Sequence, residues 1–285
     1  MFKIGVIGGS GLYEMDGLEN IDTITLSTPW GDPSDQLVKG NLGNIELFFL
    51  PRHEKGHKIM PSDINYRANI YAMKMLDVDW IISVSAVGSM KNEIAPGNIV
   101  VPTQFIDFTK KRESTFFGDG IVAHVSMANP VCPQLSQVLF NAAFSSGATV
   151  HMGGTYICIE GPQFSTKAES ELFRQWNVDV IGMTNMPEAK LAREAEICYT
   201  TMALSTDYDC WHEDFGDVSV GDVIEILHKN VDMAKVVIQN VVELIPEEHK
   251  CNCKSALENS IITSESEIKK ANLDKISLLI EGYLK

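Results

Sequence analysis

Long apolar runs are missing from this sequence. The longest apolar stretches of its 285 residues, such as residues 80–84, are far shorter than the roughly 20 residues that a membrane-spanning helix requires. The chain opens with Met1-Phe2-Lys3 and passes directly into a strand-like run, without the basic, apolar and small-residue segments of a secretory leader. We therefore expect a soluble, cytoplasmic protein with no membrane partner.

An excess of positive charge is also missing. The chain has 23 lysine and arginine residues against 38 aspartate and glutamate residues, which gives a formal net charge of −15, and no basic cluster offsets it. Such a surface repels nucleic acid and anionic membranes. We therefore expect no nucleic-acid partner, and an anionic ligand has to be held by a local site that works against the field of the whole molecule.

Cysteines are few and scattered. The chain is too large to need a disulfide framework for its six cysteines, at positions 132, 158, 198, 210, 251 and 253. Only Cys251-Asn-Cys253 is closely spaced, and with His249 it reads His-x-Cys-x-Cys without an obvious fourth ligand after it. We therefore predict no metal site. Instead, we expect Cys251 and Cys253 to be a pair of thiols in the tail, or occasionally a disulfide.

Proline and glycine do not dominate either, because 11 prolines and 21 glycines accompany a hydrophobic content of 45%. Apolar β-branched runs alternate with helical patterns, which predicts an α/β fold with a mixed sheet covered on both faces. The predicted strands are residues 3–7, 45–50, 80–84, 99–101, 155–159, 178–181 and 198–204, with further strands at 21–26, 105–108 and 122–125. The predicted helices are residues 64–76, 133–145, 168–176, 187–194 and 220–244.

One change of character divides the chain. Residues 1–250 carry the alternating pattern and are expected to form one catalytic domain. Residues 251–285 begin as a polar segment and continue, over 267–284, as an amphipathic helix. This tail is expected to pack on the body or on a neighbouring subunit.

Small and hydroxyl-bearing residues follow three of the predicted strands. These are Gly8-Gly-Ser10-Gly11, Arg52-His53 and Ser85-Ala86-Val-Gly88. Since ligands of α/β sheets sit at the carboxyl ends of strands, three such ends with one arginine predict an anion pocket. A dinucleotide fingerprint is disfavoured because Glu14 stands where its third glycine belongs.

Three later segments also carry side chains that could contact a ligand. Phe164 follows a Gly-Pro turn and either stacks on a flat ligand or fills the core. Met183-Thr184 lies between a strand and a helix, and offers a thioether and a hydroxyl. Asp207 and Asp209 follow an apolar strand and can face the same side if the strand geometry persists. A carboxyl group kept protonated by burial can act as a general acid.

In this order, the motifs resemble the methylthioadenosine phosphorylase branch of the trimeric purine nucleoside phosphorylase family. The resemblance covers about residues 2–245 and is carried by Gly8-Gly-Ser-Gly11, Pro51-Arg-His53, residues 60–69, Phe105-Ile-Asp107, residues 159–165, Gly182-Met-Thr184, residues 188–198 and residues 206–211. It implies a single-domain nucleoside phosphorylase fold, with a central mixed sheet or distorted barrel flanked by helices. It also implies reversible phosphorolysis of 5′-methylthioadenosine to adenine and 5-methylthioribose 1-phosphate.

The resemblance assigns a role to each candidate residue. Phosphate would be bound by Ser10, Arg52, His53, Ser85, the backbone N–H of Ala86, and Thr184. The nucleoside would contact Met183, Phe164, Asp207, Asp209 and a His124 lent by a neighbouring subunit, while Ser165, Val220 and Val223 would tune specificity. Asp207 would be the catalytic residue, protonated and hydrogen-bonded to purine N7. The family's chemistry needs no metal or organic cofactor, only phosphate as co-substrate, and its shared sites imply a trimer or a dimer of trimers.

The pair of aspartates also bears on the substrate. A 6-aminopurine presents a donor at position 6 and an acceptor at N7, which a protonated aspartate can match, whereas a 6-oxopurine presents two acceptors. A mismatched site leaves buried polar groups unpaired, at about 1–3 kcal/mol each. The alternatives left open are phosphorylases for other purine nucleosides such as methylthioinosine, adenosine or inosine, a hydrolytic nucleosidase, and a nucleoside-binding protein without catalysis.

Overall fold

A computed structural model describes residues 2–213, 220–280 and 282–283. The strands are β1 (Lys3–Gly8), β2 (Glu19–Ile24), β3 (Leu37–Leu42), β4 (Ile45–Pro51), β5 (Trp80–Ser89), β6 (Ile99–Val101), β7 (Gln104–Phe108), β8 (Val150–Met152), β9 (Thr155–Ile159), β10 (Val180–Gly182) and β11 (Cys198–Asp207). The helices are α1 (Tyr66–Met75), α2 (Pro133–Ser145), α3 (Lys167–Gln175), α4 (Asn185–Glu194), α5 (Val220–Leu244) and α6 (Lys270–Ile280), with short 3₁₀ turns at Cys253–Ser255 and Glu265–Glu267.

The eleven strands found among the described residues belong to one mixed sheet, and β5 is its branch point. One path runs β2-β3-β4-β1-β5-β10-β9-β7, while β11 pairs with β5 and β6, and β6 pairs with β8. The N-terminal half of β5 pairs in parallel with β1, its C-terminal end pairs antiparallel with β10, and β11 runs parallel along its whole length. This branching curves the sheet and brings the carboxyl ends of β1, β4, β5 and β11 together.

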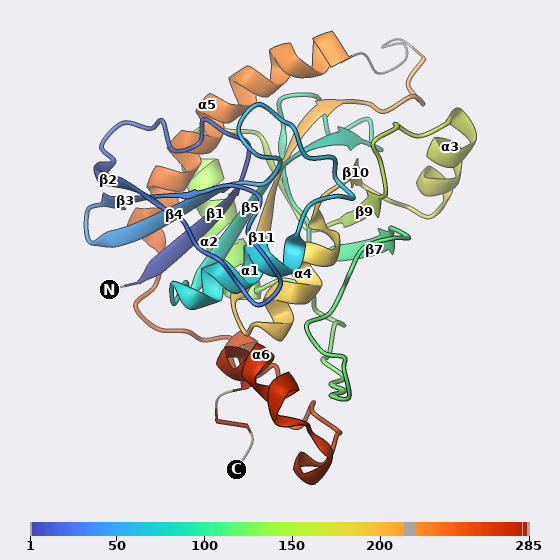
Figure 1. The fold of residues 1–285 in the computed structure, drawn as a ribbon. Helices are drawn as coiled ribbons and strands as arrows, with labels where there is room; N and C mark the ends of the chain where they lie inside the picture. The colour runs from blue at the N-terminus through green and yellow to red at the C-terminus, as the bar shows by residue number, and fades with distance from the viewer. Residues whose placement is uncertain (1, 214–219, 281, 284–285) are drawn as a thin grey trace.

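Helices cover both faces of this sheet (Figure 1). Alternation along β4 decides which face each side chain reaches: Phe48 and Leu50 pack toward α1 and α4, whereas Leu47 and Phe49 pack toward α2 and α5. In the described part of the chain, no helix is long and apolar enough to cross a membrane.

The structure confirms most of the predicted elements, with shifted ends. Strands β5 and β11 extend beyond the predicted runs, because Ser85 and Ser205 interrupt the apolar pattern just after the predicted ends but lie buried in the sheet. The prediction missed β3 and β8. The predicted strand at residues 122–125 is wrong, because this segment forms only an isolated bridge, Ala123 to Ile261.

The C-terminal tail returns to the body of the same chain. Leu257, Ile276, Leu279 and Ile280 are buried in the core cluster that also contains α1 and α4 residues. The N–H of Leu257 and the hydroxyl of Tyr283 both donate to Glu196 Oε1, at 2.9 and 2.6 Å. The tail is thus packed by apolar burial and fixed by hydrogen bonds.

Candidate active site

A cavity of about 730 Å³ opens where the carboxyl ends of the parallel strands meet. It is large enough for a nucleoside together with a small anion. Its walls contain eleven of the residues singled out from the sequence: Ser10, Arg52, His53, Ser85, Ala86, Phe164, Ser165, Met183, Thr184, Asp207 and Asp209. The branching of β5 brings these residues together, since they come from six separate segments of the chain.

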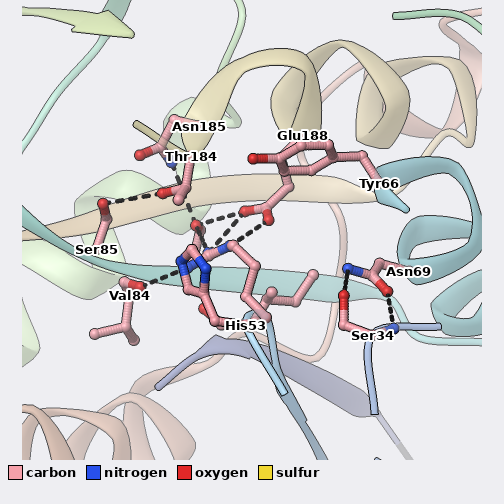
Figure 2. Close-up of polar contacts among 12 residues, drawn as sticks. Ser34, His53, Tyr66, Asn69, Val84, Ser85, Thr184, Asn185 and Glu188 are labelled. Carbon is pink, nitrogen blue, oxygen red and sulfur yellow. Dashed lines mark hydrogen bonds and ion pairs between the residues drawn. The ribbon is translucent and has the colours of Figure 1, made fainter. Parts of the chain in front are cut away.

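Three hydroxyl groups form a cluster on one wall. Ser85 Oγ on β5 lies 3.1 Å from Thr184 Oγ1, as Figure 2 shows, and 3.2 Å from the hydroxyl of Tyr156 on β9. The side chains of Ser85 and Thr184 belong to buried residues, so their hydroxyls are oriented by each other rather than by water. Preoriented hydroxyl donors of this kind suit an oxyanion.

A glycine makes this cluster possible. A Cβ at Gly182 would lie 1.9 Å from Tyr156 Oη and 3.2 Å from Val87. The tyrosine hydroxyl therefore occupies the space that any side chain at position 182 would need.

The turn after β1 lines an exposed part of the cavity. Ser10 and Gly9 are exposed to the cavity after the buried strand end at Gly8. Gly11 has a φ of 112°, which a residue with a side chain rarely adopts. Ala86 lines the same cavity, as an exposed residue inside the otherwise buried β5.

Arg52 differs from the expectation that its guanidinium is free to bind phosphate. Its Nε and Nη2 donate to Glu188 at 2.7 and 3.0 Å, Nη2 also contacts Ser83 and Ile7, and Nη1 donates to the carbonyl of Val84 at 3.1 Å. Among the described residues, only one N–H of Nη1 has no protein acceptor. Arg52 thus contributes one donor and a charge that the buried Glu188 already balances.

His53 is held as a neutral ring. Its Nδ1 lies 2.9 Å from the carbonyl of Ile59, and its ring stacks on His57 with centroids 4.4 Å apart. Burial, together with the charges of Arg52 and His57, lowers the pKa of His53 to about 4. Because the carbonyl of Ile59 can only accept, Nδ1 carries the hydrogen and Nε2 is left as an acceptor.

Two aspartates, Asp207 at the end of β11 and Asp209 just after it, also line the cavity. The hydroxyl of Thr206 and the N–H of Asp209 donate to Asp207, at 2.7 and 2.8 Å. Burial nevertheless raises the pKa of the Asp207 carboxyl, and the neighbouring Asp209 raises it further. Burial also raises the pKa of Asp209.

The strand geometry does not persist through this pair. The register between β11 and β5 shifts between Ser205 and Asp207, and Asp209 has a left-handed φ of 51°. The condition attached to the i, i+2 relation, that the strand geometry continues through both residues, is therefore not met. A bulge followed by a tight turn, rather than strand alternation, brings both carboxyl groups to the cavity.

An aromatic residue and a thioether complete the walls. Phe164 is 48% exposed and borders the cavity, which favours the stacking interpretation over the core-filling one. The Met183 side chain is packed against Gly161, where a Cβ would lie 2.5 Å from Sδ. Arg112 fixes the backbone here by donating to the carbonyls of Met183 and Glu160 at 2.7 and 2.8 Å.

Three predicted residues are not placed at the cavity. His124 is exposed and outside it, in a segment whose N–H groups pair with the tail. The side chains of Val220 and Val223 lie outside the described residues, although their backbone begins α5.

The sequence-based prediction missed the roles of Glu188, Tyr156 and Arg112. Glu188 appeared in the sequence analysis only as part of a family motif, because nothing in the local sequence indicates that its carboxylate pairs with Arg52, 136 residues away. Tyr156 lies inside an apolar strand and reads as core. No signal marked Arg112, which stands in a polar loop.

Comparison with known proteins agrees with this arrangement. The model of the phosphorylase superfamily matches residues 3–243. The S-methyl-5′-thioadenosine phosphorylase of Geobacter sulfurreducens is 58% identical over 282 residues, with 99% of each chain covered, and that of Koribacter versatilis is 50% identical, with 99% and 96% covered.

Solved structures of related phosphorylases have a similar fold. A methylthioadenosine phosphorylase from an antarctic soil metagenomic library superposes with a TM-score of 0.94 at 48% identity and covers 98% of both chains. The methylthioadenosine phosphorylase of Schistosoma mansoni in complex with adenine gives a TM-score of 0.86 at 36% identity, and covers 91% of this chain and 99% of its own.

Proposed function

Because this chain belongs to the phosphorylase superfamily and is an enzyme of that family, we propose that it catalyses the reversible phosphorolysis of 5′-methylthioadenosine. The products are adenine and 5-methylthio-α-D-ribose 1-phosphate, which return to purine and methionine salvage. One observation carries the proposal: a single cavity is lined both by a cluster of hydroxyl and backbone donors suited to an anion and by a half-buried carboxyl group, that of Asp207, whose pKa is raised.

Phosphate occupies the subsite between Ser10, Ala86 and the hydroxyls of Ser85 and Thr184, with the one remaining Nη1 hydrogen of Arg52. Neutral His53 presents Nε2 as an acceptor, which suits the P–OH of monohydrogen phosphate. The protein thereby holds the dianion without a strong excess of positive charge, and positions it for attack on the sugar.

A phosphate oxygen forms a bond to C1′ as the C1′–N9 bond breaks. The electron pair of that bond moves into the purine, where negative charge accumulates. The protonated Asp207 transfers its proton to N7, so that adenine leaves as the neutral base and Asp207 remains as the carboxylate. Phe164 covers the purine face, Met183 lies against the ribose, and Asp209 reads the 6-amino group. Ser165, Val220 and Val223 are assigned to specificity, with the valines forming an apolar subsite for the 5′-methylthio group.

His124 completes the site only from a neighbouring subunit, so the functional unit in this proposal is a trimer or a dimer of trimers. Its exposure outside the cavity of its own chain is consistent with such a role.

The primary test measures adenine release from 5′-methylthioadenosine with and without inorganic phosphate. Release only with phosphate, together with a sugar 1-phosphate, supports phosphorolysis. Release without phosphate indicates a nucleosidase, and binding without turnover indicates a nucleoside-binding protein. Inosine turned over as fast as methylthioadenosine would contradict the assignment of the aspartate pair.

Asp207→Asn tests the acid. We expect kcat on methylthioadenosine to fall by about 10²- to 10⁴-fold, because an amide cannot transfer a proton to N7. The wild-type rate should also fall as pH rises through the raised pKa of Asp207, since only the protonated carboxyl donates. Asp22→Asn is the matched control, because Asp22 is exposed on β2, away from the cavity. Near-normal kcat in Asp207→Asn would remove this residue from the acid role.

A further inference from the structure

Four of the six cysteines converge far from the candidate active site. The thiol sulfurs of Cys132, Cys198, Cys251 and Cys253 all lie within 4.8 Å of one another, and those of Cys198 and Cys251 are 3.3 Å apart. They come from three places in the chain: the residue before α2, the first residue of β11, and the tail. All four are free thiols, and three of them are buried.

We propose that these four cysteines bind a single Zn²⁺ as a closed, tetrahedral, structural site. Zn–S bonds of about 2.3 Å place the sulfurs of such a site about 3.8 Å apart, within the range of this cluster. A multi-iron cluster needs more widely separated thiolates, so one ion is the fitting occupant. Binding replaces the four thiol protons, which are released to solvent, and leaves a complex of net charge −2.

The surroundings provide what a buried thiolate complex requires. Cys132 stands at the N-cap of α2, where the helix dipole favours negative charge, and its sulfur accepts the N–H of Leu135 at 3.4 Å. Arg193 Nη1 lies 3.8 Å from the sulfur of Cys253. These N–H···S contacts are of the kind that orient and stabilise metal-bound thiolates.

The histidine of the His-x-Cys-x-Cys pattern lies beside the cluster but is not one of its four sulfur ligands. His249 stacks on Trp80 with ring centroids 4.0 Å apart, and its Nδ1 lies 3.5 Å from the sulfur of Cys198. It therefore contacts a thiol sulfur rather than completing the ligand set. The remaining two ligands, Cys132 and Cys198, are more than 50 residues away in sequence, and so the sequence-based expectation of no metal lacked them.

The position of the cluster indicates what the ion would do. Cys198 begins β11, whereas Asp207 ends it, so the cluster and the active site lie at opposite ends of a ten-residue strand. The ion would join the tail to α2 and β11 at the point where the tail leaves α5 and turns toward α6 (Figure 1). Cys251 is the partly exposed ligand, which gives the metal a route of entry.

The test measures zinc in the full-length protein, expressed with zinc and purified without chelators. We expect one zinc ion per chain, four thiols that react with a thiol reagent only after chelation, and a fall in Tm when the metal is removed. Exchange with Co²⁺ should give the intense thiolate-to-cobalt absorption of a tetrathiolate site. When metal-free protein is titrated with Zn²⁺ in weak buffer, it should bind one ion per chain and release the four thiol protons for each ion bound.

Variants locate the ion. Cys251→Ser and Cys198→Ser should each lower the zinc content of the protein at least tenfold. Cys210→Ser is the control; its zinc content is the only quantity compared, and it should match that of the wild type. Where a variant does not fold, the wild-type chelation and cobalt measurements still decide. The proposal is overturned if the purified protein contains no metal and its four thiols react freely. It is also overturned if the protein's mass is four hydrogens lower, which indicates two disulfides, or if Cys251→Ser keeps its zinc. None of these outcomes depends on whether methylthioadenosine is the substrate.

Discussion

At the scale of single residues, Gly182 sets the position of the hydroxyl cluster. In Gly182→Ala the new Cβ would overlap Tyr156 Oη, so the tyrosine has to move and its hydroxyl leaves Ser85. Losing one such hydrogen bond costs about 0.5–1.5 kcal/mol, so we expect KM for phosphate to rise about 2- to 13-fold. The KM for methylthioadenosine should change less, and steady-state kinetics with each substrate varied in turn measure both.

Tyr156→Phe is the control, since it removes the hydroxyl without filling space. If the glycine acts through this hydroxyl, the two variants raise the KM for phosphate similarly. An unchanged KM in Gly182→Ala would place phosphate elsewhere in the cavity.

Glu188 supports the site by balancing Arg52. Both groups are buried, so Glu188→Ala leaves an unpaired cation in the core. Removing one partner of a buried pair costs about 3–5 kcal/mol, and we expect the free energy of unfolding in urea to fall by that amount. Glu54→Ala breaks the exposed pair with Lys58 and should cost less than about 1 kcal/mol. Equal effects of the two substitutions would contradict the structural role of Glu188.

At the scale of elements, Glu194 links α4 to the loop that carries Thr115 and Phe116. The hydroxyl of Thr115 and the N–H of Phe116 donate to its two oxygens, both at 2.7 Å. Burial raises the pKa of Glu194 to about 7 from its ordinary 4.5. A raised carboxyl pKa in the folded state means that the stability contribution is fully present below pH 4.5 and is lost as pH rises to about 7.

Glu194→Gln removes this titration. The wild type should lose roughly 3 kcal/mol relative to the variant between pH 4.5 and pH 8, because one pKa unit corresponds to about 1.4 kcal/mol. Urea unfolding at several pH values measures the difference. Glu19→Gln, at an exposed position on β2, should run parallel to the wild type. Parallel curves for Glu194→Gln would show that this carboxyl does not titrate in the range.

Elements were predictable where the pattern is local, and the site only in part. Periodicity located β1, α2 and β9 closely, since their side chains alternate or repeat within a few residues. The bulge that presents Asp207 depends on pairing between distant strands, which no local pattern contains. The sequence analysis also predicted the residues of the proposed anion subsite, but it could not show that Glu188 already pairs with the guanidinium of Arg52.

At the scale of the whole molecule, the tail is part of the core of the chain rather than an appendage. Four of its apolar side chains, at 257, 276, 279 and 280, are buried against the cluster that contains α1 and α4 residues. Burying such side chains contributes about 1.5–3 kcal/mol each, or roughly 6–12 kcal/mol together, which approaches the total stability of about 5–15 kcal/mol of a typical protein.

A chain that ends at residue 250 should therefore fail to reach a stable fold. We expect it to be insoluble or to show no cooperative thermal transition by circular dichroism, while the full chain does. Ile276→Asp in the full chain should lower the free energy of unfolding by several kcal/mol through the same burial, whereas Ala271→Asp, at an exposed position of α6, should not. A truncated chain that unfolds cooperatively and stays active would make residues 1–250 an independent folding unit, and the tail's burial would then be a consequence of that fold rather than one of its causes.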